Sequence, residues 1–176
     1  MSLALWSKKL KYSQSTELAI DSLFFMAAHP EWTDFSVEQI AQAQHVSPSY
    51  LSKIFQQLVK AGLLRSHRGS KGGYMLGRAP AQVSLRDVAA IFEGSSPLYE
   101  CNANAKLCQL GPKCLIMATF SEAERKMQEV LAKVSLQDVV NHSAKESGWI
   151  TFQKPAVVAA ASVHELQKTL GANDER

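Results

Sequence analysis

Residues 47–76 of the chain read SPSYLSKIFQQLVKAGLLRSHRGSKGGYML. Ser47 followed by Pro48 is typical of a helix start, because a serine hydroxyl accepts hydrogen bonds from free amides and proline fits the first turn. Apolar residues then recur every three or four positions as far as Leu58, and Gly62 is suited to end the helix in a left-handed conformation. This pattern predicts a helix that begins at Pro48 and ends before Gly62.

The rest of this stretch predicts a β-hairpin. Residues 63–68 and 73–76 have the composition of short strands. The Gly-Ser-Lys-Gly sequence of residues 69–72 between them is typical of a tight turn. A helix followed closely by such a hairpin predicts a winged helix, in which the hairpin is the wing.

Helices predicted on both sides complete this unit. Apolar spacing and capping residues predict helices at residues 16–28 before Pro30, at residues 37–43 after Ser36, and at residues 85–93 between Ser84 and Gly94. The second of these is joined by a short turn to the helix that begins at Pro48, which is typical of a helix-turn-helix. We therefore expect residues 10–94 to form a mainly α, winged helix-turn-helix domain with a small β-hairpin.

Basic residues are concentrated in the same region. No acidic residue occurs from Gln39 to Arg86, whereas seven basic residues do: Lys53, Lys60, Arg65, Arg68, Lys71, Arg78 and Arg86. A basic face of this kind suits a polyanion such as nucleic acid. The alternative is an ordinary solvated surface that happens to be basic.

A long helix is predicted at residues 115–134, with one apolar face. Its apolar positions are Phe120, Ala123, Met127, Val130 and Val134. Such a seam favours pairing with a second copy of the chain, and the alternative is that it packs on its own winged-helix domain. We expect residues 115–142 to be this dimerisation helix with one more helical turn, and residues 143–176 to be a partly disordered tail.

All three cysteines lie between these two parts, in residues 95–114, a loop without helical periodicity. Six residues separate Cys101 from Cys108, and five separate Cys108 from Cys114. Soft thiolate sulfurs at such spacings favour an iron–sulfur cluster. Structural zinc sites usually combine close C-x-x-C pairs with four ligands, which this loop lacks. Zinc and free thiols remain the alternatives.

Composition narrows the class of protein. The chain has 176 residues, of which 46% are hydrophobic and 20% charged, as in a globular protein with one core of domain size. The sequence contains no secretory signal and no apolar run long enough for a membrane span, so we expect a cytoplasmic protein. It also contains no nucleophile–base pair, phosphate loop or carboxylate dyad, which argues against an enzyme.

The order of these parts resembles the Rrf2 family of bacterial transcriptional regulators, from about Leu10 to Val140. The similarity rests on SPSYL at residues 47–51, LVKAGL at residues 58–63, RGSKGGYML at residues 68–76, and the three cysteines. It implies a homodimer on a double-stranded DNA operator, with the second helix of the motif in the major groove and the wing in the neighbouring minor groove.

Several residues fit DNA contacts in that arrangement. They are Ser47, Ser49, Tyr50, Ser52 and Lys53 on the recognition helix, and Arg68, Ser70 and Lys71 on the wing. For Tyr50 the alternative is a core aromatic beneath the helix.

The resemblance also implies a cofactor and its ligands. Several members of the family bind an iron–sulfur cluster, which here would be a two-iron or four-iron cluster on the three cysteines. In one branch a histidine stands three residues after the last cysteine, but this chain has Met117 there. In another branch a carboxylate from the other subunit completes the site, and Glu17 stands at that position. Asp21 and Glu100 are further candidates.

We therefore expect a repressor that senses iron, redox or nitric-oxide status through the cluster. A first alternative is a cluster-free repressor of the same family, switched by thiol oxidation or by a protein partner. A second alternative is an iron–sulfur electron carrier whose basic surface is incidental.

Overall fold

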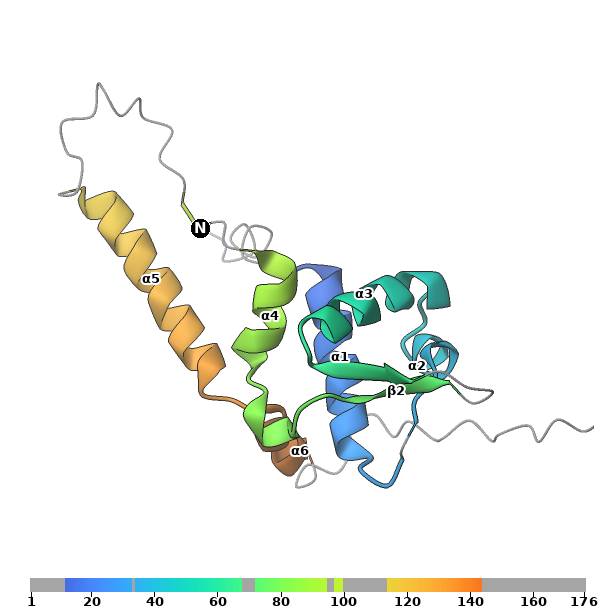
Figure 1. The fold of residues 1–176 in the computed structure, drawn as a ribbon. Helices are drawn as coiled ribbons and strands as arrows, with labels where there is room; N and C mark the ends of the chain where they lie inside the picture. Colours follow the sequence, from blue (N-terminus) through green and yellow to red (C-terminus); the bar gives the residue numbers. More distant parts are fainter. Residues whose placement is uncertain (1–11, 33, 68–71, 95–96, 100–113, 144–176) are drawn as a thin grey trace, which may run out of the picture.

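The computed structural model describes residues 12–32, 34–67, 72–94, 97–99 and 114–143 (Figure 1). Its elements are α1 (Gln14–Ala28), α2 (Val37–Ala43), α3 (Pro48–Lys60), β1 (Leu64–His67), β2 (Gly73–Leu76), the 3-10 turn η2 (Pro80–Gln82), α4 (Leu85–Glu93), α5 (Leu115–Ala132) and α6 (Leu136–Ser143). The predicted fold class is confirmed: a mainly α chain carries one two-stranded antiparallel hairpin and a long C-terminal helix. We call α1 to α4 with the hairpin the winged-helix body.

The predicted capping boxes set the starts of α2 and α4. Ser36 accepts a hydrogen bond from Gln39 N, and the Gln39 side chain accepts one from Ser36 N. Ser84 and Asp87 make the same reciprocal pair at α4. Both helices have the predicted bounds, because each box satisfies amides that a helix start leaves free.

The other two helices of the body differ in how well their starts were predicted. At α3, Ser47 Oγ accepts from Tyr50 N, as expected. At α1 the cap is Ser13, whose Oγ accepts from Thr16 N at 3.3 Å. The helix therefore begins at Gln14, two residues before the predicted start.

In the hairpin β2 has the predicted bounds, and β1 begins at Leu64, one residue after the predicted start. Leu64 pairs with Leu76 and His67 with Gly73. Gly62, with φ of 72°, ends α3 in the predicted left-handed conformation and starts the turn into β1. Residues 68–71, which include the end of the first predicted strand, lie outside the described residues.

One core holds the body together. α3 buries its predicted apolar face, and Phe55 of that face meets the ring of Tyr74 from β2 edge-on, with centroids 4.9 Å apart. The largest fully buried side chains include Phe55, Leu23, Met26, Ile40, Leu51, Ile54 and Leu58. Each contributes about 1.5–3 kcal/mol of burial free energy, and Leu136 of α6 is buried in the same core.

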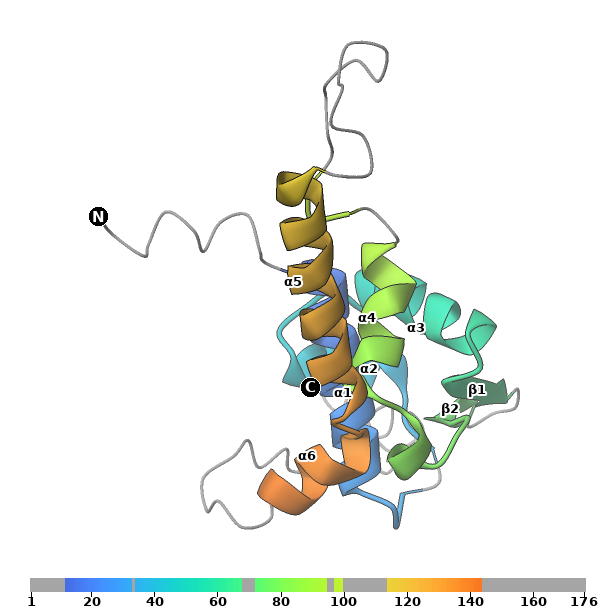
Figure 2. The same cartoon turned by 90° about the vertical axis from the view of Figure 1, so that its left-hand side faces the viewer.

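The long helix lies on the side of the body opposite the hairpin, against α4 (Figures 1 and 2). None of the residues of α5 is fully buried. It ends at Ala132, two residues before the predicted end, because Val134 enters an extended bridge: its carbonyl accepts from Leu85 N at 3.0 Å.

That bridge fastens the end of α5 to the body. The sequence Val-Ser-Leu-x-Asp occurs twice, at residues 83–87 and 134–138. In both copies the serine Oγ accepts a hydrogen bond from the backbone N–H of the aspartate and so caps the helix that follows. The backbones of Ser84 and Ser135 form an antiparallel bridge. The second bond of the bridge runs from Leu136 N to the carbonyl of Val83 at 2.9 Å. Leu136 is fully buried beside it.

Candidate nucleic-acid interface

The N-terminal turn of α3 presents polar side chains to solvent. Ser47, Ser49 and Lys53 are exposed, and Ser52 is half-buried. Ser47 is already engaged as the helix cap, and its hydroxyl also lies 3.3 Å from the hydroxyl of Ser49. The turn therefore offers hydroxyl groups and one ammonium group to a ligand that approaches along the helix.

The surroundings of Tyr50 bear on the two roles considered for it, a DNA contact and a core aromatic. Its ring is half-buried against the core, and its hydroxyl lies 3.0 Å from Ser15 Oγ on α1. The tyrosine thus links the recognition helix to the first turns of α1.

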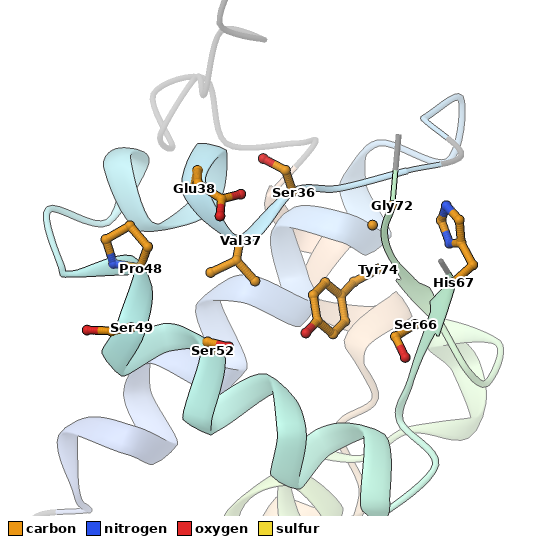
Figure 3. Close-up of a pocket in the computed structure, with 11 residues that line it drawn as sticks. Ser36, Val37, Glu38, Pro48, Ser49, Ser52, Ser66, His67, Gly72 and Tyr74 are labelled. Carbon is orange, nitrogen blue, oxygen red and sulfur yellow. The ribbon is translucent and has the colours of Figure 1, made fainter. Parts of the chain in front are cut away.

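A groove separates this turn from the hairpin. It has a volume of about 440 Å³ and is lined by Ser36, Val37, Glu38, Pro48, Ser49, Ser52, Ser66, His67, Gly72, Gly73 and Tyr74. Figure 3 shows the hydroxyls of Ser49 and Ser52 on the α3 side and Ser66 on the hairpin side. Sequence reasoning singled out only the α3 side, because the groove brings together segments that lie far apart in the chain.

Glu38 is the acidic member of this groove. It is exposed in the first turn of α2, immediately before the acid-free stretch begins. The sequence signal available for Glu38 was its position as the last acidic residue before the acid-free stretch.

The basic residues are spread over two sides of α3 and β1. Lys53 and Lys60 border a second groove along the outer face of α3. Arg65 and Arg78 border a third, on the other side of the hairpin. Arg78 also donates a hydrogen bond to the carbonyl of Ala61 at 3.3 Å. Its positive charge there interacts favourably with the negative, C-terminal end of the α3 dipole.

The cysteine region is described only at its end. Cys114 is a free, half-buried thiol at the N-cap position of α5, where no side chain caps the helix amides. Cys101, Cys108 and Glu100 lie outside the described residues, as do the predicted wing residues Arg68, Ser70 and Lys71. Within the described ranges, no group of three histidine, cysteine or acidic side chains could hold a metal ion.

The candidate carboxylates of α1 stand one turn apart. Glu17 and Asp21 are both exposed. Partial burial, and then the nearby charge of Glu17, raise the pKa of Asp21 above its usual value.

The start of α1 is held by α4. The carboxylate of Glu93 accepts hydrogen bonds from the amide and the hydroxyl of Ser13, at 2.8 and 2.9 Å, and from the hydroxyl of Thr16. These bonds lower the pKa of Glu93, although partial burial opposes them. The turn that carries Glu17 is therefore fixed to the end of the helix that leads into the cysteine loop.

The predicted apolar seam of α5 divides between two surroundings. Phe120 and Met127 are half-buried, and the ring of Phe120 stacks on Tyr99 with centroids 4.8 Å apart. Ala123 is exposed, and Val130 is 63% exposed. Part of the seam is thus used within the chain, as the alternative had it, and part is open.

Comparison with known proteins bears on this architecture. The family model described as "Rrf2: Iron-dependent Transcriptional regulator" matches residues 12–142. The HTH-type transcriptional regulator NsrR of Shouchella clausii (strain KSM-K16) is 27% identical over 132 residues, which are 74% of this chain and 89% of the relative.

Solved structures give the same result. T. potens IscR has a TM-score of 0.63 and 26% identity, and the match covers 79% of this chain and 93% of that chain. The structure of CymR (YrzC), titled the global cysteine regulator of B. subtilis, has a TM-score of 0.59 and 27% identity, with 76% and 98% covered.

A winged helix-turn-helix followed by a long helix, with these relatives, defines a DNA-binding transcriptional regulator and not an enzyme. Because the family model spans most of the chain, the chain belongs to the Rrf2 family. The resemblance drawn from the sequence is confirmed. No helix in the described part of the chain is long and apolar enough to cross a membrane.

Proposed function

We propose that this Rrf2-family regulator is a cytoplasmic homodimer that represses transcription from a double-stranded DNA operator and senses iron, redox or nitric-oxide status through an iron–sulfur cluster. One observation carries the proposal: the exposed polar turn of α3 lies beside the hairpin on the acid-free, basic part of the chain, and all three cysteines fall in one loop that ends at α5.

The polar turn of α3 supplies the base contacts. The hydroxyls of Ser49 and Ser52 are suited to base edges and phosphates, and Lys53 to a phosphate. Arg68, Ser70 and Lys71 of the wing follow the adjacent minor groove, where a narrow width attracts cations. Because these contacts neutralise phosphates, the affinity falls steeply with salt.

The open part of α5 supports the homodimer. Ile116, Ala123 and Val130 are exposed and stand seven residues apart, so they form one stripe along the helix. Such a stripe buries its apolar area when two helices pair. Phe120, Met127 and Val134 then support it from the side of the winged-helix body.

The donor set fits an iron–sulfur cluster. Cys101, Cys108 and Cys114 offer three thiolates, and the uncapped amides at the start of α5 favour negative charge on a ligand bound there. Glu17 from the partner subunit would complete the site. The bound cluster supplies reactivity towards oxidants, nitric oxide and iron supply. The Glu93 hydrogen bonds would hold the Glu17 turn in position, so Glu17 would link the cluster site to α1.

A cluster-free switch is the second candidate. It is supported by the structural similarity to CymR and by the presence of Met117 in place of a histidine ligand. In this case a cysteine thiol is oxidised, or a protein partner binds, and the DNA affinity changes without iron. The electron-carrier alternative is not supported, because the family is one of transcriptional regulators.

One experiment separates these accounts. The protein is purified without oxygen, its iron is measured, and its binding to DNA fragments recovered from genomic DNA is titrated before and after iron chelation. We expect bound iron, visible absorption, and a loss of DNA affinity on chelation. Cys108→Ser should remove all three, whereas Asn104→Ser in the same loop should change none. An iron-free protein whose affinity responds to thiol oxidants would instead establish the cluster-free switch.

A further inference from the structure

The turn end of the hairpin is attached to the segment that precedes α2. Phe35 N donates to the carbonyl of Tyr74 at 3.0 Å, and Tyr74 N donates to the carbonyl of Phe35 at 2.9 Å. Through these two bonds Phe35 forms an isolated antiparallel bridge with Tyr74 of β2. The hairpin is therefore held near its turn as well as by its connection to α3.

An ion pair crosses β2 at the same place. His67 Nε2 on β1 lies 2.8 Å from Asp34 Oδ1, and the two side chains are 38% and 45% exposed. His67 is paired with Gly73 in the hairpin register, and Gly73 lies next to Phe35 and Asp34. Asp34 and His67 thus meet across the strand that lies between them.

Gly73 is what permits this contact. A Cβ atom built on Gly73 would lie 3.2 Å from the carbonyl oxygen of Phe35 and 3.4 Å from Cβ of Asp34. A side chain at this position would therefore crowd the segment whose carboxylate reaches His67. Gly73 therefore has a packing role within β2.

The ion pair borders the groove between the hairpin and α3. His67 lines that groove together with Ser49 and Ser52. Figure 3 places the imidazole on the side of the hairpin away from these two serines, towards the segment before α2. His67 is also the last described residue of β1 before the predicted DNA contacts of the wing. A change at this pair would move the wing relative to the recognition helix.

We propose that Asp34 and His67 are positioning residues that hold the wing at a fixed distance from the N-terminal turn of α3, so that both contact DNA at once. The inference depends on the proposed DNA-binding function. Asp34 and His67 contact each other and not DNA, and they affect DNA binding by setting the position of the wing.

Asp34 is the group in direct contact with His67. Glu38 lines the same groove from α2, Tyr74 lies on β2, and Arg65 lies two residues away on β1. The 2.8 Å contact between Asp34 and His67 therefore joins the end of β1 to the segment before α2.

The test measures DNA affinity by fluorescence anisotropy with duplexes selected from a random pool. Exposed contacts of this kind are weak, so His67→Ala should lower the affinity by roughly two- to fivefold. His67→Gln keeps a hydrogen bond to Asp34 and should retain more of the affinity than His67→Ala does. His142→Gln, at an exposed position of α6, is the matched control and should leave the affinity unchanged.

A double-mutant cycle separates positioning from a merely structural role. Lys71→Ala removes a predicted wing contact, and its loss of affinity should be smaller in the His67→Ala background than in the wild type. Equal losses in both backgrounds, or an affinity of His67→Gln no higher than that of His67→Ala, would overturn the inference while the proposed function stands. A wild-type protein that binds no selected duplex would overturn the proposed function itself.

Discussion

The winged-helix body and α5 bury apolar surface in different ways. The body contains fully buried side chains from α1, α2, α3 and α4, and its helices start at serine caps that satisfy the first amides. α5 has no fully buried residue, and Leu115 and Val130 on it are 78% and 63% exposed. The body therefore has a packed core, whereas α5 leaves apolar side chains exposed within the described part of the chain.

The two ends of α5 are held differently. Its C-terminal end is joined to the body by the backbone bridge between Ser84 and Ser135, whereas nearer its N-terminal end Phe120 stacks on Tyr99. The helix follows Cys114 directly. Under the proposed function, a ligand bound to the cysteines would act on this N-terminal end of α5.

The first prediction compares the same substitution in the two regions. Leu58→Ala removes a fully buried side chain from the body and should lower the free energy of unfolding by about 2–5 kcal/mol. Leu115→Ala removes an exposed side chain from α5 and should change it by no more than about 0.5 kcal/mol. Urea unfolding followed by circular dichroism, at a protein concentration where the chain is monomeric, measures both. Similar losses for the two variants would mean that α5 is part of the core.

The second prediction concerns the open stripe of α5. Val130→Asp places a carboxylate in the proposed dimer interface, where a charge without a partner is costly, and should raise the dimer dissociation constant by roughly tenfold or more. Analytical ultracentrifugation over a range of concentrations measures the constant.

Ser121→Asp is the control for this variant. It adds the same charge to α5, nine residues from Val130 and so on the opposite side of the helix, and it should leave the dimer intact. If both variants dimerise as the wild type does, the chain pairs through another surface.

The contrast between the regions also explains what could be predicted from the sequence. In the body, the bounds of α2, β2 and α4 were predicted correctly, because local capping boxes and turn residues determine them. The start of α1 was misplaced, because Ser13 owes its role partly to Glu93, eighty residues away. The short turn η2 had no helical periodicity to indicate it.

The candidate site was less accessible from the sequence. The polar turn of α3 was identified, because its residues are contiguous. The bond between Tyr50 and Ser15, the division of the α5 seam and the pair of Asp34 with His67 were not, because each depends on how distant segments pack. The role of α5 as a dimerisation helix and the ligands of the cluster remain predictions, because partner and cofactor are not encoded in local patterns.

The last and smallest predicted effect concerns the joint between the two regions. Ser84→Ala removes the cap of α4 and should cost about 1 kcal/mol of stability. The hydrogen bond from the Ser84 side chain, more than the backbone bond and nearby arginines, holds the pKa of Asp87 below its usual value against a partial burial effect. A carboxylate with a lowered pKa stabilises the folded state above its unfolded pKa of about 3.9, and this contribution is lost as the pH falls below that value.

The difference in stability between the wild type and Ser84→Ala should therefore be largest near neutral pH and shrink in the acid range below about pH 4. Urea unfolding at several pH values measures it. Ser135→Ala makes the corresponding change at α6, where Asp138 is exposed, and should cost less because water replaces the lost hydrogen bond. If Ser135→Ala costs more than Ser84→Ala, the fastening of α5 contributes to the stability of the body itself, and the two regions are not independent.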